Sequence, residues 1–209
     1  MLKTLLPLLV ISSFLFGCGG PTESPVQDAD VTSEPTWRRV MESELDPIQR
    51  DQLRRAVAAQ QEMAHTMMAE LTSELENGGA TGAIVVCRDL APMIADAVST
   101  EHGLAIGRTS QRLRNPSNTG PEWVSMVVDE GFDELATFAG PGGELGVTLP
   151  IRTAAPCLAC HGPSDGLDSE ILTALAENYP DDRAVDFAEG DLRGWFWVEV
   201  PVETTISGG

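Results

Sequence analysis

Five consecutive residues, Cys157 to His161, have the types and spacing needed to attach a haem group covalently. They read Cys-Leu-Ala-Cys-His, which is the CxxCH pattern of c-type haem attachment. Two thiols separated by two residues can add across the two vinyl groups of haem, and the adjacent His161 then reaches the iron as its proximal ligand. The sequence therefore predicts one covalently attached haem c, held by Cys157, Cys160 and His161.

Two other uses of this cysteine pair agree less well with the sequence. A zinc site would need a second pair of ligands, and only Cys87, His65 and His102 are available, at no familiar spacing. A thioredoxin-like dithiol would precede a helix within a βαβ unit, and no such unit is predicted. Haem attachment is therefore the preferred interpretation.

The first residues predict the oxidising compartment that this chemistry requires. Residues 1–17 carry one positive charge, at Lys3, followed by an apolar run that is too short to span a bilayer, as in a signal peptide. The run ends at Cys18 in a sequence that resembles the lipobox of bacterial lipoproteins, although an ordinary signal peptide is the alternative. We expect an exported chain on the periplasmic side, lipidated at Cys18 and anchored to the outer rather than the inner membrane.

Composition separates a tether from one folded domain. Residues 19–36 contain three prolines and no aromatic residue, so residues 18–36 are expected to be a lipidated, disordered tether and residues 37–209 a single domain. The chain has 13 basic and 32 acidic residues, a net charge of −19, which excludes nucleic acid as a partner. Such a surface favours a redox or signalling partner with a basic surface, and it is also compatible with a saline habitat.

Periodic apolar residues predict helices in the first half of the domain. Asp46 and Pro47 are typical of a helix start, and a long amphipathic helix should continue to about Asn77. Its Met63, Met67 and Met68 are interpreted as core, or as the seam of a homodimer, rather than as metal ligands. A second segment, residues 83–98, begins with an apolar run and carries Cys87 near its start.

Later segments alternate as strands do. Strands are expected at residues 104–114, 145–152 and 195–202, with one more helix near residues 168–178. Asp165, Asp168 and Glu170 do not follow a calcium-binding loop, so Asp168 is expected to cap that helix. Helices followed by strands indicate an α+β fold, an antiparallel sheet flanked by helices.

Cys87 has no predicted disulfide partner, because the other three cysteines are assigned to lipid and haem. It is either a small buried apolar residue or a second axial ligand of the iron. If Cys87 only packs, the remaining ligand candidates are His65, His102 and several methionines.

Widely spaced segments resemble one family. They are Ala83 to Cys87, Ala91 to Ala95, Gly107 to Ser110, Leu113 to Pro116, Pro121 to Trp123, Pro150-Ile151, Cys157 to Gly162, Tyr179-Pro180 and Gly190 to Gly194. In order and spacing the chain resembles the single-haem c-type, sensor-like domains long catalogued as a domain of unknown function. The resemblance implies a PAS-like fold around one haem, with His161 and Cys87 on opposite sides of the iron.

Arginines offer partners for the two haem propionates. Arg108, Arg112 and Arg114 alternate along the expected strand, and a guanidinium pairs bidentately with a carboxylate. Arg112 and Arg114 are the expected propionate ligands, with pairing to surface acids as the alternative.

Three roles remain open for such a haem protein. The first is a redox or diatomic-gas sensor in which Cys87 leaves the iron, and the second is a low-potential electron-transfer cytochrome, because a thiolate ligand favours ferric iron. The third is peroxidase-like chemistry, for which His65 or His102 is a weak candidate. No nucleophile, phosphate-loop or metal-hydrolase motif is present, so we expect a protein that is not an enzyme.

Overall fold

The computed structural model describes residues 36–203. The expected signal peptide, the lipidated Cys18 and nearly all of the expected tether lie outside these residues. Within the described part of the chain, no helix has both the length and the apolar character needed to span a membrane.

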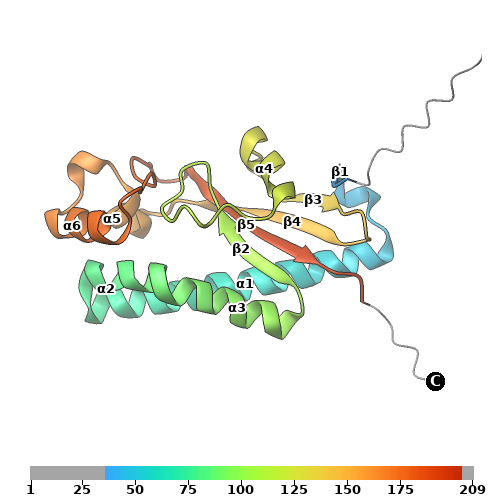
Figure 1. The fold of residues 1–209 in the computed structure, drawn as a ribbon, viewed down its shortest axis with the longest axis horizontal. Helices are drawn as coiled ribbons and strands as arrows, with labels where there is room; N and C mark the ends of the chain where they lie inside the picture. The colour runs from blue at the N-terminus through green and yellow to red at the C-terminus, as the bar shows by residue number, and fades with distance from the viewer. Residues whose placement is uncertain (1–35, 204–209) are drawn as a thin grey trace, which may run out of the picture. The chain divides into compact units, whose positions relative to one another are not determined.

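Helices form one layer, beginning with α1 (Pro47–Asn77). The Asp46 carboxylate accepts a hydrogen bond from the backbone N–H of Gln49 at 2.8 Å, and the Gln49 side chain accepts one from the backbone N–H of Asp46 at 3.0 Å. This reciprocal pair satisfies N–H groups that a helix start otherwise leaves free, which confirms the start expected from the sequence. The helices α2 (Gly79–Val85) and α3 (Ala91–His102) then run back beside α1 (Figure 1).

A π-helical turn, η2 (Val86–Leu90), joins α2 to α3 and contains Cys87. Its last hydrogen bond runs from the N–H of Ala91 to the carbonyl of Val86, one residue further back than in an α-helix. Pro92 has no N–H and cannot make the next α-helical bond, so the widened turn precedes it. The sequence predicted one uninterrupted segment here, and the structure divides it at Cys87.

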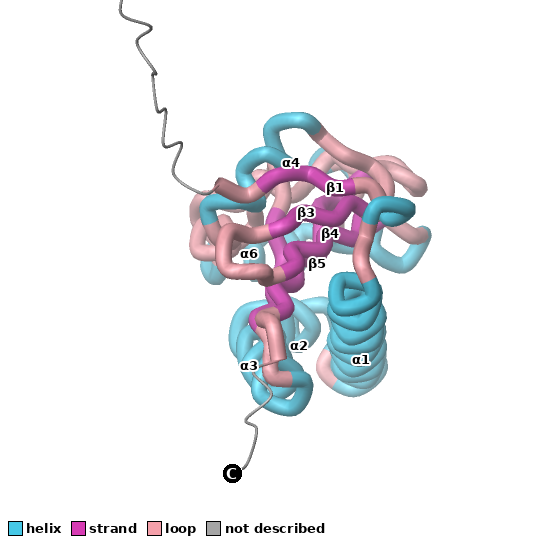
Figure 2. Tube along the Cα trace, turned by 90° about the vertical axis from the view of Figure 1, so that its right-hand side faces the viewer, coloured by secondary structure: helices cyan, strands magenta, loops and turns pink. Residues whose placement is uncertain are grey.

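The strands form one antiparallel sheet in the order β1-β3-β4-β5-β2. Their bounds are β1 (Arg38–Val40), β2 (Ala105–Thr109), β3 (Ala136–Ala139), β4 (Leu145–Arg152) and β5 (Leu192–Val200). The sheet lies above the helical layer in Figure 2, with the short helix α4 (Ser125–Glu130) on its other side. The combination confirms the expected α+β class and its long N-terminal helix.

Apolar side chains fill both faces of this sheet. Val147 and Val198 are fully buried in the cluster that joins the sheet to α1 and α3. On the opposite face, Trp123, Phe138 and Trp195 form a second cluster under α4. Alternation along the strands therefore places successive residues in different cores.

The strand expected at residues 104–114 is shorter than predicted, since β2 ends at Thr109. The Ser110 hydroxyl accepts from the backbone N–H of Arg112 at 3.0 Å and donates to the carbonyl of Arg193 at 2.6 Å. These side-chain hydrogen bonds replace the backbone hydrogen bonds between β2 and β5, and the chain turns away from β5. Arg112 and Arg114 therefore do not alternate along a strand with Arg108, as the sequence analysis supposed.

Residues 153–191 leave the sheet after β4 and return to it at β5. The segment is closed at its base, where the N–H of Thr153 donates to the carbonyl of Asp191 at 2.9 Å and the N–H of Gly190 to that of Thr153 at 2.7 Å. It contains the short helices η4 (Ala155–Cys157), α5 (Leu158–His161) and η5 (Ser164–Gly166), followed by α6 (Ser169–Asn178). We call residues 153–191 the attachment loop.

The attachment loop packs on α2. Ile84 of α2 is buried among Ile171, Leu175 and Tyr179 of the loop, and Cys160 packs against the same cluster. The first turn of α6 is capped by Asp168, whose carboxylate accepts from the N–H of Glu170 at 2.8 Å, as expected. Helix α2 and the CxxCH segment are thus held together by apolar contacts.

Candidate functional site

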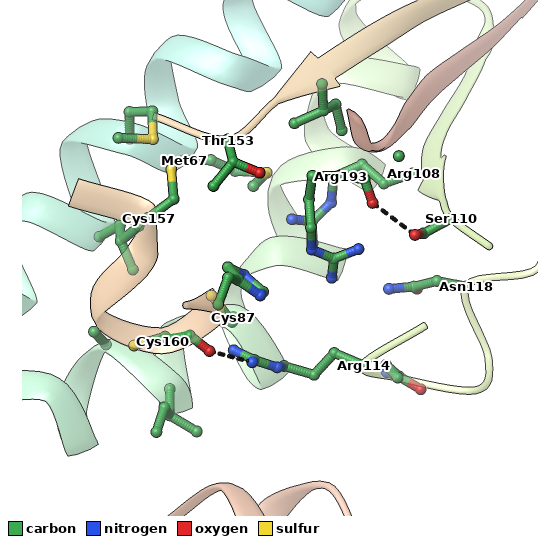
Figure 3. Close-up of a pocket in the computed structure, with 18 of the residues that line it drawn as sticks. Met67, Cys87, Arg108, Ser110, Arg114, Asn118, Thr153, Cys157, Cys160 and Arg193 are labelled. Atoms are coloured by element: carbon green, nitrogen blue, oxygen red, sulfur yellow. Dashed lines mark hydrogen bonds between the residues drawn. The ribbon is translucent and has the colours of Figure 1, made fainter. Parts of the chain in front are cut away.

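A cavity lies where α1, α2, the ends of β2 and β5 and the attachment loop meet. Its space, counted together with the part that is open to solvent, is about 1210 Å³. Its apolar wall comes mainly from the two helices, through Met67, Met68, Leu71, Leu75, Ala83 and Ile84. Polar and sulfur-containing side chains project from the other walls (Figure 3).

The three residues of the CxxCH pattern all face this cavity. Cys157 ends η4, and Cys160 and His161 follow in the single turn of α5. Both thiols are half-buried, and neither forms a disulfide within residues 36–203. Burial raises the pKa of the Cys160 thiol. One short helical turn thus presents two thiols and an imidazole to the same space.

The imidazole of His161 is held in one orientation and one tautomer. Its Nδ1 lies 2.6 Å from the carbonyl oxygen of Ala184, which can only accept, so Nδ1 carries the proton and Nε2 keeps its lone pair. Burial and the nearby guanidinium groups of Arg114 and Arg193 lower the pKa of His161 to about 3. The ring is therefore a neutral ligand with a free Nε2, the state in which histidine binds a metal.

Cys87 reaches the same cavity from the helical layer. Its position in the π-helical turn also places it on the wall of a second, smaller cavity of about 630 Å³, shared with Arg108, Asn118 and Trp197. The indole Nε1 of Trp197 is buried there without a hydrogen-bond partner. The structure thus brings Cys87 and the CxxCH segment to one site, although they are far apart in the sequence.

The other candidate iron ligands are the two remaining histidines and the methionines, and only some of them lie at the cavity. His65 is exposed on α1, and the Nε2 of His102 lies 2.8 Å from a carboxylate oxygen of Glu62; neither residue lines the cavity. Met67 and Met68 do line it, whereas Met63 is buried in the core. Met67 is half-buried and packs against the core that contains Met63, so core packing is correct for these two, whereas Met68 is 46% exposed and not part of the core. The alternative of a homodimer seam stays a prediction.

Arg114 lines the cavity, but its guanidinium is already engaged by the protein. Its Nε donates to the Asp182 carboxylate at 3.0 Å, and its Nη2 donates to the carbonyls of Cys160 at 2.6 Å and Ala184 at 3.2 Å. Arg114 therefore holds two backbone carbonyls beside His161. One belongs to Cys160, the preceding residue, and the other to Ala184, which is the acceptor for the imidazole. This is a positioning role.

Arg112 lies outside the cavity. Its Nη1 donates to the carbonyl of Val185 at 2.8 Å, and its guanidinium stacks on the ring of Phe187, 3.5 Å from the centroid. The structure therefore does not bring this expected propionate ligand to the site.

Three further residues line the site that were not among the ligands expected from the sequence, although Arg108 was noted there beside Arg112 and Arg114. Arg108, Arg193 and Tyr179 line the cavity, and burial lowers the pKa of Arg193 to about 10 and raises that of Tyr179 to about 12. Arg108 and Arg193 come from the neighbouring strands β2 and β5, so only the strand pairing reveals that they belong together. Among residues 36–203, no cluster of three or more histidine, cysteine or acidic side chains could hold a bare metal ion.

Comparisons with known proteins found a family model and a solved structure that match this chain. The family model described as Tll0287-like matches residues 41–201. A solved structure, described as the crystal structure of the cyanobacterial heme-protein Tll0287, matches with a TM-score of 0.57 and 23% sequence identity. The match covers 79% of this chain and 100% of that one. No curated protein sequence matches.

Proposed function

The chain belongs to the Tll0287-like family, and from this premise we propose that it is a haem protein that carries one covalently attached haem c in the cavity described above. The observation that carries the proposal is the neutral, oriented His161 beside two free thiols. The solved relative is described as a heme-protein, which supports the same assignment.

The residues present match the chemical needs of such a group. Cys157 and Cys160 would form the two thioether bonds, and His161 would bind the iron through Nε2. The helical wall provides apolar surface, and the opposite wall provides half-buried guanidinium groups for carboxylates. When bound, haem c supplies an iron that changes between the ferric and ferrous states.

We further propose Cys87 as the second axial ligand and a redox- or gas-responsive role for the protein. A thiolate ligand would favour the ferric state. Cys87 also lines the second cavity, which offers its side chain space when it is not bound to iron. A low-potential electron-transfer role is the other candidate, because an acidic chain with a net charge of −19 would attract a basic redox partner.

The test of haem attachment uses the exported chain, produced with and without a c-type haem maturation system. With the system present, we expect an intact mass increased by one haem, a Soret band and a pyridine haemochrome spectrum typical of two thioether bonds. Without it, the mass should equal that of the bare polypeptide. A colourless protein of unmodified mass in both preparations would refute the proposal.

The Cys87→Ser variant tests the second ligand. The ferric protein should show a low-spin, thiolate-type electron paramagnetic resonance signal, and the substitution should abolish it while the haem content stays the same. Met67→Leu is the matched control, because Met67 lines the same cavity and offers the other sulfur ligand. A signal lost in Met67→Leu but kept in Cys87→Ser would reject the assignment of Cys87.

Ligand-binding spectra of the reduced protein separate the two roles. Binding of CO or NO to the ferrous wild-type protein would support a gas-responsive role, since Cys87 must then have left the iron. A ferrous protein that stays six-coordinate and ignores both gases would favour electron transfer.

A further inference from the structure

Two half-buried arginines of the cavity, Arg108 and Arg193, have no acidic partner among the described residues. Neither Arg108 nor Arg193 forms an ion pair with any carboxylate of residues 36–203. Arg193 uses Nη1 to donate to the carbonyl of Arg112 at 3.1 Å, and its buried Nε has no acceptor. Arg108 makes no side-chain hydrogen bond within the described part of the chain. Charges partly withdrawn from water are normally paired, and the Nε of Arg193 is fully buried, so the two arginines indicate an anionic ligand.

The neighbouring Arg114 differs in this respect. Its charge is balanced by Asp182 at 3.0 Å, in a pair whose side chains are 9% and 10% exposed. The cavity is therefore lined by three arginines, of which Arg114 is buried and Arg108 and Arg193 are half-buried, and only Arg114 has a carboxylate partner among the described residues. Two positive charges remain unbalanced, and they repel each other, since Arg108 is one of the groups that lower the pKa of Arg193.

The positions of these arginines match the chemistry of haem c. Arg108 and Arg193 lie across the cavity from Cys157 and Cys160 (Figure 3). In a haem molecule the two vinyl groups, to which the thiols would add, lie on a different part of the ring edge from the two propionates. A haem attached at the CxxCH segment would therefore direct its propionates toward the wall that contains the two arginines.

The sheet brings the two arginines together. β2 and β5 are antiparallel neighbours, and the Ser110 hydroxyl bonds the carbonyl of Arg193 at 2.6 Å. A Cβ added at Gly194 would lie 2.2 Å from the carbonyl oxygen of Thr109, so only glycine permits this approach of the two backbones. Arg108 immediately precedes Thr109, and Arg193 immediately precedes Gly194, so both arginines lie next to this close approach of the two strands.

We propose that Arg108 and Arg193 bind the two haem propionates, in place of Arg112 and Arg114 expected from the sequence. This inference rests on the proposed haem attachment. Two guanidinium groups and two carboxylates balance in charge, and each guanidinium offers the paired N–H groups that a carboxylate accepts. The two residues thereby set the haem orientation from the edge opposite the thioether bonds.

The test uses the holoprotein and reads the propionates directly. Resonance Raman spectra of the propionate bending modes should shift in Arg108→Gln and in Arg193→Gln, and the reduction potential should fall in both, since a nearby positive charge is lost. Arg183→Gln is the control, because Arg183 is exposed and does not line the cavity; it should match the wild type in both measurements.

Two more variants keep the test decisive if the glutamine variants do not accumulate. Arg108→Lys and Arg193→Lys retain the charge but lose the paired N–H geometry, so the bending modes should shift while the potential stays near that of the wild type. Unshifted modes in these variants, or a shift only in Arg112→Gln or Arg114→Lys, would overturn the inference. Intact mass reports haem attachment separately, so a wild-type chain without haem refutes the proposed function, and a haem-loaded variant without a shift refutes only the propionate assignment.

Discussion

Replacing both Cys157 and Cys160 with serine will leave the purified chain without covalently bound haem. Both thiols line the cavity and neither is engaged in a disulfide, so each is available for a thioether bond. Serine keeps the size and polarity of the side chain but has no sulfur. The intact mass should equal that of the bare polypeptide, even when the maturation system is present.

The same variant separates covalent attachment from binding. His161 keeps its bond to Ala184 in the double variant, so the cavity can still bind haem reversibly. Any bound haem should then be extracted completely by acidified butanone, whereas it should stay on the wild-type protein. Cys87→Ser is the matched control and should retain the covalent adduct. A double variant that keeps an acid-stable haem would disprove the role given to the two thiols.

Replacing Arg114 with leucine will destabilise the fold by about 3–5 kcal/mol, the range for loss of one partner of a buried ion pair. Asp182 would be left buried without a counter-charge, and the carbonyls of Cys160 and Ala184 would lose a donor. Urea unfolding of the haem-free chain, monitored by tryptophan fluorescence, measures the difference.

An exposed ion pair of the same chemistry provides the control. Arg152 and Asp133 lie 2.9 Å apart with side chains 47% and 63% exposed, so Arg152→Leu should cost no more than about 1 kcal/mol. The double variant Arg114→Leu with Asp182→Leu should recover part of the stability, because it removes the unbalanced charge. Equal losses in Arg114→Leu and Arg152→Leu would contradict the structural role of Arg114.

Local patterns in the sequence were sufficient for the long and regular elements. The helix start at Asp46 depends on three or four neighbouring residues, and β4 (Leu145–Arg152) has the bounds expected for it. The short strands β1 (Arg38–Val40) and β3 (Ala136–Ala139) were not expected. Three or four residues carry too little periodicity, and their pairing depends on distant partners.

The candidate site was only partly predictable for the same reason. CxxCH is a local pattern, and Cys87 was reached by accounting for the remaining cysteines. Arg108 and Arg193 are brought together by strand pairing, which the sequence does not display. Arg112 was placed at the cavity because the strand was expected to continue, and the turn at Ser110 removed the alternation on which that placement depended.

The attachment loop leaves and rejoins the sheet at adjacent points, so the pairing of β4 with β5 does not depend on the length of the loop. Thr153 closes its base through backbone bonds to Asp191 and from Gly190, directly after the last β4–β5 pair, Arg152 and Leu192. Insertions, deletions or exchanged ligands within the loop can therefore alter the chemistry of the site without shifting the strand register. The attachment loop can therefore vary in sequence while the sheet stays the same. Exchanging the loop between relatives is a direct way to exchange their properties.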